Sequence, residues 1–251
     1  MKLRVILVFV SLFASCYGVV DVEKILKVCD RNSVDVNDCL VDAVQEGLTV
    51  MADGIEELDV PPVDPYHQKE LRVEYKNNQI LAKFVAKNIY VEGLKSSKVL
   101  DTRLRADEDR FHMEVDLTTP LVHVHGSYRG EGRYNSLQIL AYGRFDTNMT
   151  DLVYTWKLDG VPETNENGTF IRITDFYMRP DVGDMKSYLS NDNRESRELT
   201  ELGNRFTNNN WRLLYREFLP FAQENWNKIG IHVANKVFLK VPYDQLFPTK
   251  S

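Results

Sequence analysis

The chain has 251 residues, with 31 Lys and Arg against 37 Asp and Glu, which gives a formal net charge of −6 at pH 7. This acidic balance argues against nucleic acids and anionic membrane surfaces as partners, because both are bound through basic patches. A hydrophobic content of 43% is enough for an ordinary core, and the absence of a Gly/Ser- or Pro-rich linker favours one large domain over two small ones.

The first 18 residues, MKLRVILVFVSLFASCYG, have the layout of a secretory signal peptide. Lys2 and Arg4 give a basic start, and residues 5–14 are apolar apart from one serine. This stretch is well short of the ~20 residues that a membrane span needs, which argues against an anchor. We therefore expect residues 1–18 to be a signal peptide and residues 19–251 to be a single secreted domain, with a net charge near −8.

Other features fit an exported chain. Cys16 lies in the predicted signal, so Cys29 and Cys39 are the two cysteines that remain, and in an oxidising compartment they are expected to pair with each other. A disulfide that closes so short a loop stabilises the folded chain by ~2–3 kcal/mol. We therefore expect it to act as a local cross-link at the entry to the first helix. The sequons at Asn148 and Asn167 predict N-glycosylation.

The first helix is predicted to begin at Asn37 or Asp38, since either residue can cap it. Gly54 lies near its predicted end, and the prolines between 61 and 65 forbid continuation. Apolar residues recur at helical spacings and predict one stripe that faces a core: Leu40, Val44, Leu48, Met51 and Ile55.

Residues 71–178 are typical of strands. Segments such as LRVEY, FHMEVDL, LVHVHGSY and LVYTWKL are rich in β-branched and aromatic residues, and polar or Gly-containing segments such as DTNMTD separate them. Strands at this spacing along the chain, without segments of helical periodicity between them, predict an antiparallel sheet or barrel. Pro120 interrupts one strand-like run and predicts an edge or a bulge there.

The last quarter is predicted to be helical again. Residues 194–202 favour a short helix, and residues 208–239 favour a long one of ~45 Å. Pro220 is expected to kink or locally interrupt the long helix. Its predicted apolar face consists of Leu214, Phe218, Phe221, Ala222, Ile229, Val233 and Val237.

A long helix wrapped by a curved sheet either fills its interior with side chains or leaves an elongated apolar space. A lipid of about 15 carbons offers roughly 10 kcal/mol of burial free energy, and the cost of association leaves micromolar to nanomolar binding. The residues that we expect to line such a space on the helices are Val44, Leu48, Met51, Leu214, Phe218, Phe221, Ile229 and Val233.

Signals for catalysis are poor. The sequence contains no G-x-S-x-G, no H-E-x-x-H and no phosphate-binding Gly-rich loop, so we expect neither an enzyme nor a cofactor. His123 and His125 are two residues apart, so on a strand they share one face and could bind a metal, with His112 as a third ligand. No carboxylate or cysteine stands at a matching spacing, and we favour a solvated or hydrogen-bonded pair over a metal site.

Several segments together resemble the insect takeout and haemolymph juvenile-hormone-binding family. Residues 54–65, GIEELDVPPVDP, follow the Cys29–Cys39 pair and resemble the family's N-terminal signature. Gly126-Ser127-Tyr128 with Gly130 is similar to its central strands, and Asn210-Trp211 opens a helix like its last one. Residues 237–248, VFLKVPYDQLFP, resemble its closing segment. The segments occur in the family's order over essentially the whole mature chain.

This resemblance implies an α+β, tubular lipid-binding fold, in which a strongly curved antiparallel sheet wraps a long helix around an internal hydrophobic tunnel. It implies carriage of juvenile hormone, another isoprenoid or a fatty-acid-like lipid in haemolymph or another extracellular fluid. Roles in circadian, feeding or mating behaviour are associated with the family. Tyr128 is an expected lining residue, and Tyr142 departs from the family's pattern at a point that could reshape the tunnel wall.

The expected partner is thus a small hydrophobic ligand, with no nucleic acid and no stable membrane insertion; a receptor is left open. Three alternatives remain at this point. A lipocalin-type barrel would also be a carrier, but it has a shorter chain and one short helix. A recognition protein without a ligand would have the same sequence pattern with a filled core. A secreted lipid hydrolase is disfavoured by the missing nucleophile motif.

Overall fold

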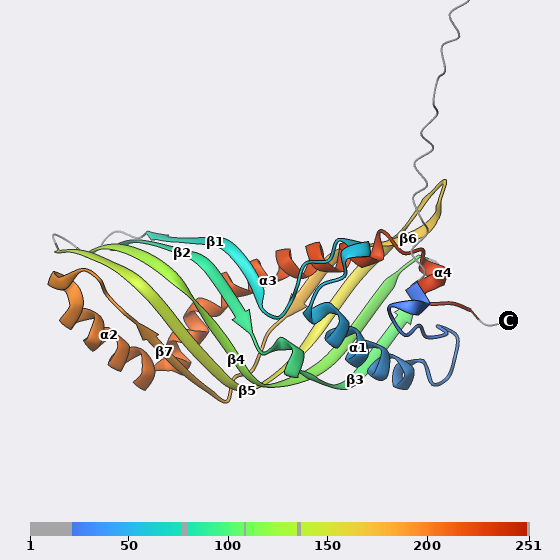
Figure 1. Ribbon diagram of the computed structural model, residues 1–251, viewed down its shortest axis with the longest axis horizontal. Helices are drawn as coiled ribbons and strands as arrows, with labels where there is room; N and C mark the ends of the chain where they lie inside the picture. Colours follow the sequence, from blue (N-terminus) through green and yellow to red (C-terminus); the bar gives the residue numbers. More distant parts are fainter. Residues whose placement is uncertain (1–21, 77–79, 108, 135–136, 250–251) are drawn as a thin grey trace, which may run out of the picture.

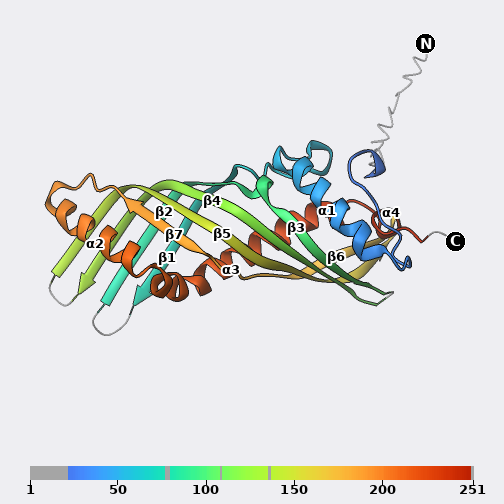
Figure 2. The ribbon, with the colours of Figure 1, turned by 90° about the horizontal axis from the view of Figure 1, so that it is seen from below.

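The computed structural model describes residues 22–76, 80–107, 109–134 and 137–249. The molecule is elongated: helix α1 (Val36–Ala52) and the short helix α4 (Tyr243–Leu246) lie at one end, and α2 (Arg197–Asn209) lies at the other. Helix α3 (Trp211–Phe238) runs between the two ends (Figure 1). A view turned by 90° shows the same separation of α1 from α2 (Figure 2). The predicted signal peptide lies outside the described residues.

The described strands form one seven-stranded antiparallel sheet in the order β1-β2-β4-β5-β6, in which β3 also pairs with β4 and β7 with β5. Strands β4 and β5 are 24 and 29 residues long and form its spine, because each pairs with two different strands along one edge. The strand bounds are β1 Tyr66–Lys76, β2 Ile80–Glu92, β3 Lys98–Ala106, β4 Phe111–Tyr134, β5 Leu137–Asn165, β6 Gly168–Met178 and β7 Asp184–Leu189.

Pro120 lies where β4 changes its partner. The last β4 residue that pairs with β3 is Thr118, and the first that pairs with β2 is His123. Between them this edge of β4 has no strand partner, so the missing N–H of Pro120 breaks no ladder hydrogen bond. The predicted edge is confirmed. The segment DTNMTD, predicted to be a break, instead continues β5, and Asp151 adopts φ 53° opposite Pro120.

Helix α1 begins at Val36, so the prediction that Asn37 or Asp38 caps it is wrong. Asn37 is used to hold β3 instead. Its Oδ1 accepts a hydrogen bond from the Leu104 N–H at 3.1 Å, and its carbonyl accepts one from Thr102 Oγ1 at 2.7 Å. The Cys29–Cys39 disulfide is present, which confirms the predicted pairing beside the first turn of α1.

Asparagine side chains attach both late helices to strand edges. On α2, Asn204 makes two hydrogen bonds to the backbone of Leu189, and Asn208 makes two to Ser187. The amide group offers both an N–H donor and a carbonyl acceptor, so each asparagine hydrogen-bonds to the backbone N–H and C=O of one edge residue, as a neighbouring strand would. Helix α3 continues through Pro220, so no interruption occurs there.

The filled core lies at the α1 end of the molecule. Phe111, Leu117 and Ile171 are fully buried in it, and α1 contributes Leu40 and Leu48. A second buried cluster joins Val22, the first described residue, to residues 55–60 and to the C-terminal segment. Its members are Val22, Ile55, Leu58, Val60, Val237 and Val241. Single-turn helices complete the fold: η1 Val22–Lys24, η2 Glu56–Leu58, η3 Leu94–Ser96 and η4 Arg194–Ser196.

Candidate functional site

Large apolar side chains are exposed on α2, at the end opposite the filled core (Figure 1), and on the first half of α3. We call this set the α2–α3 apolar surface. The relative exposures lie between 43% and 59%, values that are high for so many large apolar side chains on two consecutive helices. Its members are Leu199, Leu202, Phe206, Leu213, Phe218 and Phe221.

The apolar stripe of α2 is exposed because the helix packs through its polar face. At 100° per residue, positions 199, 202 and 206 lie opposite Asn204 and Asn208, which bind the edge of β7. An amphipathic helix normally buries its apolar stripe. Here the attachment to β7 leaves that stripe free to bind something else.

Helix α3 differs between its two halves. Its last turns pack into the core, where Val237 is buried and Asn235 makes two hydrogen bonds to the backbone of Ile173 on β6. In the middle of the helix, Asn225 exchanges hydrogen bonds with the side chain of Gln68 on β1. The helix therefore links opposite edges of the sheet. Its first half packs Trp211 and Tyr215 against the main core but keeps Phe218 and Phe221 exposed.

Tyr128 and Tyr142, both predicted to line the tunnel, face opposite sides of the sheet. Tyr128 is buried and stacks on Phe84 at 5.8 Å, and its hydroxyl donates to the Ser190 carbonyl at 2.9 Å. This burial raises the pKa of Tyr128. Tyr142 pairs with Arg129, one position along from the pair of Tyr128 with Gly143, so it shares the face with the charged side chains. The two tyrosines cannot line the same interior.

The other predicted lining residues separate by position. Leu48 is 3% exposed inside the main core, and Val44 packs against that core. Met51 and Val233 pack against the second cluster. The residues of α3 nearer its start are less covered: Leu214 and Ile229 are partly buried, and Phe218 and Phe221 are exposed. The tunnel itself remains a prediction.

One buried polar atom on α3 has no hydrogen-bond partner among the described residues, and that is Asn227 Oδ1. It lies between the exposed first half of the helix and the packed last turns. A buried acceptor without a partner costs about 1–3 kcal/mol. A donor on a bound molecule would remove that cost.

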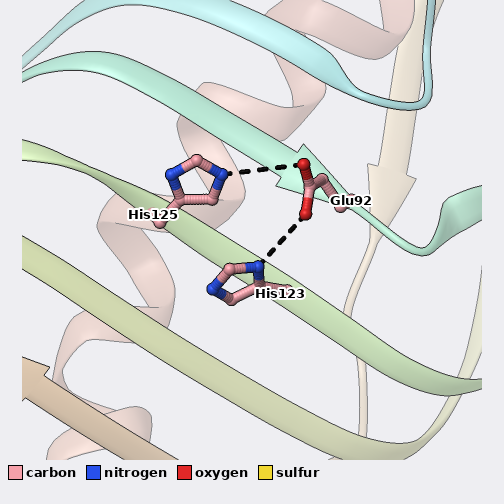
Figure 3. A group of neighbouring side chains, drawn as sticks. All are labelled: Glu92, His123 and His125. Atoms are coloured by element: carbon pink, nitrogen blue, oxygen red, sulfur yellow. Dashed lines mark hydrogen bonds and ion pairs between the residues drawn. The ribbon is translucent and has the colours of Figure 1, made fainter.

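His123 and His125 meet a carboxylate that the sequence pattern did not indicate. Glu92, at the end of β2, lies 3.1 Å from His123 Nδ1 and 3.7 Å from His125 Nε2 (Figure 3). Asp146 lies 2.8 Å from the other nitrogen of His123. The hydrogen bonds to Asp146 and then Glu92 raise the pKa of His123, and the contact with His123 lowers the pKa of Glu92. His112, the third predicted ligand, instead lies beside Asp159 and Glu114.

The two sequons have different surroundings. Asn167 is exposed at the turn between β5 and β6. Asn148 lies within β5, paired with His123 on one side and Lys186 on the other, and is partly buried. Within the described ranges, none of the helices combines the length and apolarity that crossing a bilayer requires.

Comparison with known proteins identifies both a sequence family and a fold. The family model described as haemolymph juvenile hormone binding protein (JHBP) matches residues 6–248. The crystal structure of Epiphyas postvittana Takeout 1 is similar with a TM-score of 0.71 and 19% identity, over 88% of this chain and 99% of that one. A structure of lipopolysaccharide binding protein aligns with a TM-score of 0.35 and 12% identity, over 80% of this chain and 38% of that one. No curated protein matches the sequence. The Takeout 1 likeness confirms the predicted fold of a curled antiparallel sheet with a long C-terminal helix.

Proposed function

The chain belongs to the haemolymph juvenile hormone binding protein family, and from that premise we propose that it is a secreted carrier whose small hydrophobic ligand binds against the α2–α3 apolar surface. One observation carries this placement: six large apolar side chains on two consecutive helices are exposed, while the opposite end of the molecule holds the filled core. On monomeric soluble proteins, large exposed apolar patches mark interaction surfaces and ligand-binding grooves.

The energetics favour a lipid-sized ligand. Each buried CH₂ contributes about 0.8 kcal/mol, so a chain of about 15 carbons gains roughly 10 kcal/mol before the cost of association. Juvenile hormone, another isoprenoid or a fatty-acid-like lipid meets this requirement. Carriage needs no catalytic residue, and no motif for a lipid hydrolase supports the enzymatic alternative.

The features that indicate export of the chain support the same carrier function. The signal peptide at residues 1–18 and one domain over residues 19–251 remain part of the proposal, and the Cys29–Cys39 disulfide suits an oxidising compartment. Of the two sequons, we expect Asn167 to carry a glycan, because its side chain is exposed at a turn.

The direct test is to purify the protein from the medium of insect cells and to identify bound molecules by native mass spectrometry and organic extraction. The carrier proposal expects a lipid or isoprenoid at close to one molecule per chain, and uptake of a fluorescent fatty acid after delipidation. An empty protein that also fails to take up the probe would instead indicate a recognition protein without a ligand.

A further inference from the structure

We propose that Glu92, His123 and His125 form a binding site for a divalent cation of borderline softness, of which Zn²⁺ fits best, on the outer face of the sheet. This site shares no residue with the α2–α3 apolar surface, because Glu92 lies on β2 and both histidines lie on β4. Two imidazoles and a carboxylate are a ligand set that zinc binds, with a water at the fourth position.

The distances are those of a site that needs only small side-chain adjustments. One ligand atom from each of the three residues lies within 4.8 Å of the others. In a tetrahedral site with metal–ligand distances of ~2.0–2.2 Å, neighbouring ligand atoms are ~3.3 Å apart. The Glu92 carboxylate contacts His123 through Oε2 at 3.1 Å and His125 through Oε1 at 3.7 Å, so a small rotation of the carboxylate is needed for one oxygen to serve as the ligand beside both imidazoles. Both imidazole rings face the carboxylate (Figure 3).

Asp146 supplies the outer-shell partner that zinc-bound histidines usually have. It lies 2.8 Å from Nε2 of His123, whose Nδ1 faces Glu92. When Nδ1 binds the cation, the Nε2–H donates to the Asp146 carboxylate, which fixes the ring and its tautomer. The arrangement is a carboxylate–histidine–metal triad.

A β-bulge places Glu92 on the correct face. The register between β2 and β4 shifts by one residue between Lys87 and Tyr90, and Asn88 in the bulge has φ 49°. Without the shift, Val91 would lie opposite His123 and Glu92 would face the interior. Gly126 makes room for the bulge, since a Cβ there would be 3.0 Å from the carbonyl oxygens of Lys87 and Asn88.

The site is open to solvent on one side, with side-chain exposures of 28% to 45% for the three ligands. A cavity of about 410 Å³ adjoins it and is lined in part by His125, Asp146 and Arg144. Space for a water ligand is therefore present. A bound cation would join the end of β2 to β4 beside Pro120, where β4 has no strand partner on that edge, and would stabilise the folded chain by linkage.

His112 is a matched control within the same strand. It also lies beside two carboxylates, with Nδ1 2.9 Å from Asp159 and Nε2 3.5 Å from Glu114. Those carboxylates already form ion pairs with Arg110 and Lys157, respectively. Among the described residues, His112 does not belong to a set of three histidine, cysteine or carboxylate side chains that lie close enough to share one ion.

The test is calorimetric titration of untagged, secreted and chelator-treated protein with ZnCl₂, together with Co²⁺ absorption spectroscopy. We expect one Zn²⁺ per chain, a tetrahedral Co²⁺ spectrum that Zn²⁺ displaces, and a higher Tm with Zn²⁺. His123→Asn, His125→Asn and Glu92→Gln should each weaken binding at least tenfold. Asp146→Asn should weaken it about tenfold but keep the form of the Co²⁺ spectrum. His112→Asn should bind as the wild type does.

The proposal is overturned if Zn²⁺ does not bind with one-to-one stoichiometry, or if His123→Asn and His125→Asn bind as tightly as His112→Asn. The latter result would mean adventitious contacts with surface histidines only. Circular dichroism of each variant distinguishes lost binding from lost folding. Because the readouts involve no lipid, they do not depend on whether the protein is a carrier.

Discussion

Asn235 on α3 binds both backbone groups of Ile173 on β6: its Oδ1 accepts from the N–H at 2.8 Å, and its Nδ2 donates to the carbonyl at 2.9 Å. Ile173 is 1% exposed, so water cannot replace these hydrogen bonds. The side chain of a helix thus takes the place of the next strand of the sheet. This contact anchors α3 at the core end, while its other half keeps apolar side chains exposed.

Replacing Asn235 by Ala should therefore destabilise the fold strongly. Each buried backbone group left without a partner costs about 1–3 kcal/mol, and 1 kcal/mol lowers the Tm of a domain of this size by roughly 2–4 °C. We expect a loss of at least 5 °C in thermal denaturation. Asn225→Ala, which breaks hydrogen bonds only to the Gln68 side chain, should lower the Tm by less than half as much. Equal losses would contradict the special role of Asn235.

The carrier site can be tested with two leucines of similar exposure. Leu202 on α2 is 56% exposed within the α2–α3 apolar surface, and Leu100 on β3 is 52% exposed near the core end. Replacement by Gln removes similar apolar area from both. We expect Leu202→Gln to weaken uptake of a fluorescent fatty acid about threefold to tenfold and Leu100→Gln to leave it unchanged. If both variants bind the probe as tightly as the wild type, the ligand lies elsewhere.

The sequence predicts most of the secondary structure because hydrophobic periodicity reports local geometry. The long helix from Trp211 and the run of antiparallel strands are confirmed. The polar segment 146–151 was wrongly predicted to be a break, because Asp146 and Asn148 lie on the outer face of a strand that is paired on both sides. The cap prediction at Asn37 was wrong because that side chain binds the backbone of β3, a contact distant in sequence.

The candidate site was less predictable. Periodicity identifies the face of α1 that turns inward, but it does not distinguish an interior filled by side chains from one left open. Leu48, predicted to line a ligand space, lies in the filled core. Glu92 could not be assigned to the His123 and His125 pair, because its face depends on a one-residue bulge in β2. Asn88, with its positive φ, and Gly126 are weak local signals of that bulge.

The fold should lose stability in acid through Glu114, whose hydrogen bonds with Lys157 and then Arg103 lower its pKa to about 2. A lowered pKa in the folded state means that the ionised group stabilises the fold above its unfolded pKa of about 4.3, and that this contribution disappears as the pH falls toward 2. After a discount for solvent screening, we expect ionised Glu114 to contribute roughly 1 kcal/mol to the free energy of unfolding at pH 7.

Glu114→Gln should therefore be less stable than the wild type at pH 7 by about 2–4 °C in Tm, and the difference should close between pH 5 and pH 2. Glu131→Gln, an exposed glutamate on the same strand, serves as the control and should follow the wild type at every pH. A Tm difference for Glu114→Gln that stays constant down to pH 2 would rule out ionisation as its source.

Leu48 allows the filled core to be separated from the ligand site. Leu48→Ala removes a side chain that is 3% exposed in the main core, and such substitutions cost about 2–5 kcal/mol through lost burial and the cavity left behind. We expect a large fall in Tm, measured by circular dichroism, with fatty-acid uptake per folded molecule unchanged at a temperature where the variant is fully folded. Leu202→Gln should show the reverse, with weakened uptake and little change in Tm. Reduced uptake by folded Leu48→Ala would instead place α1 beside the ligand, as helical periodicity alone predicted.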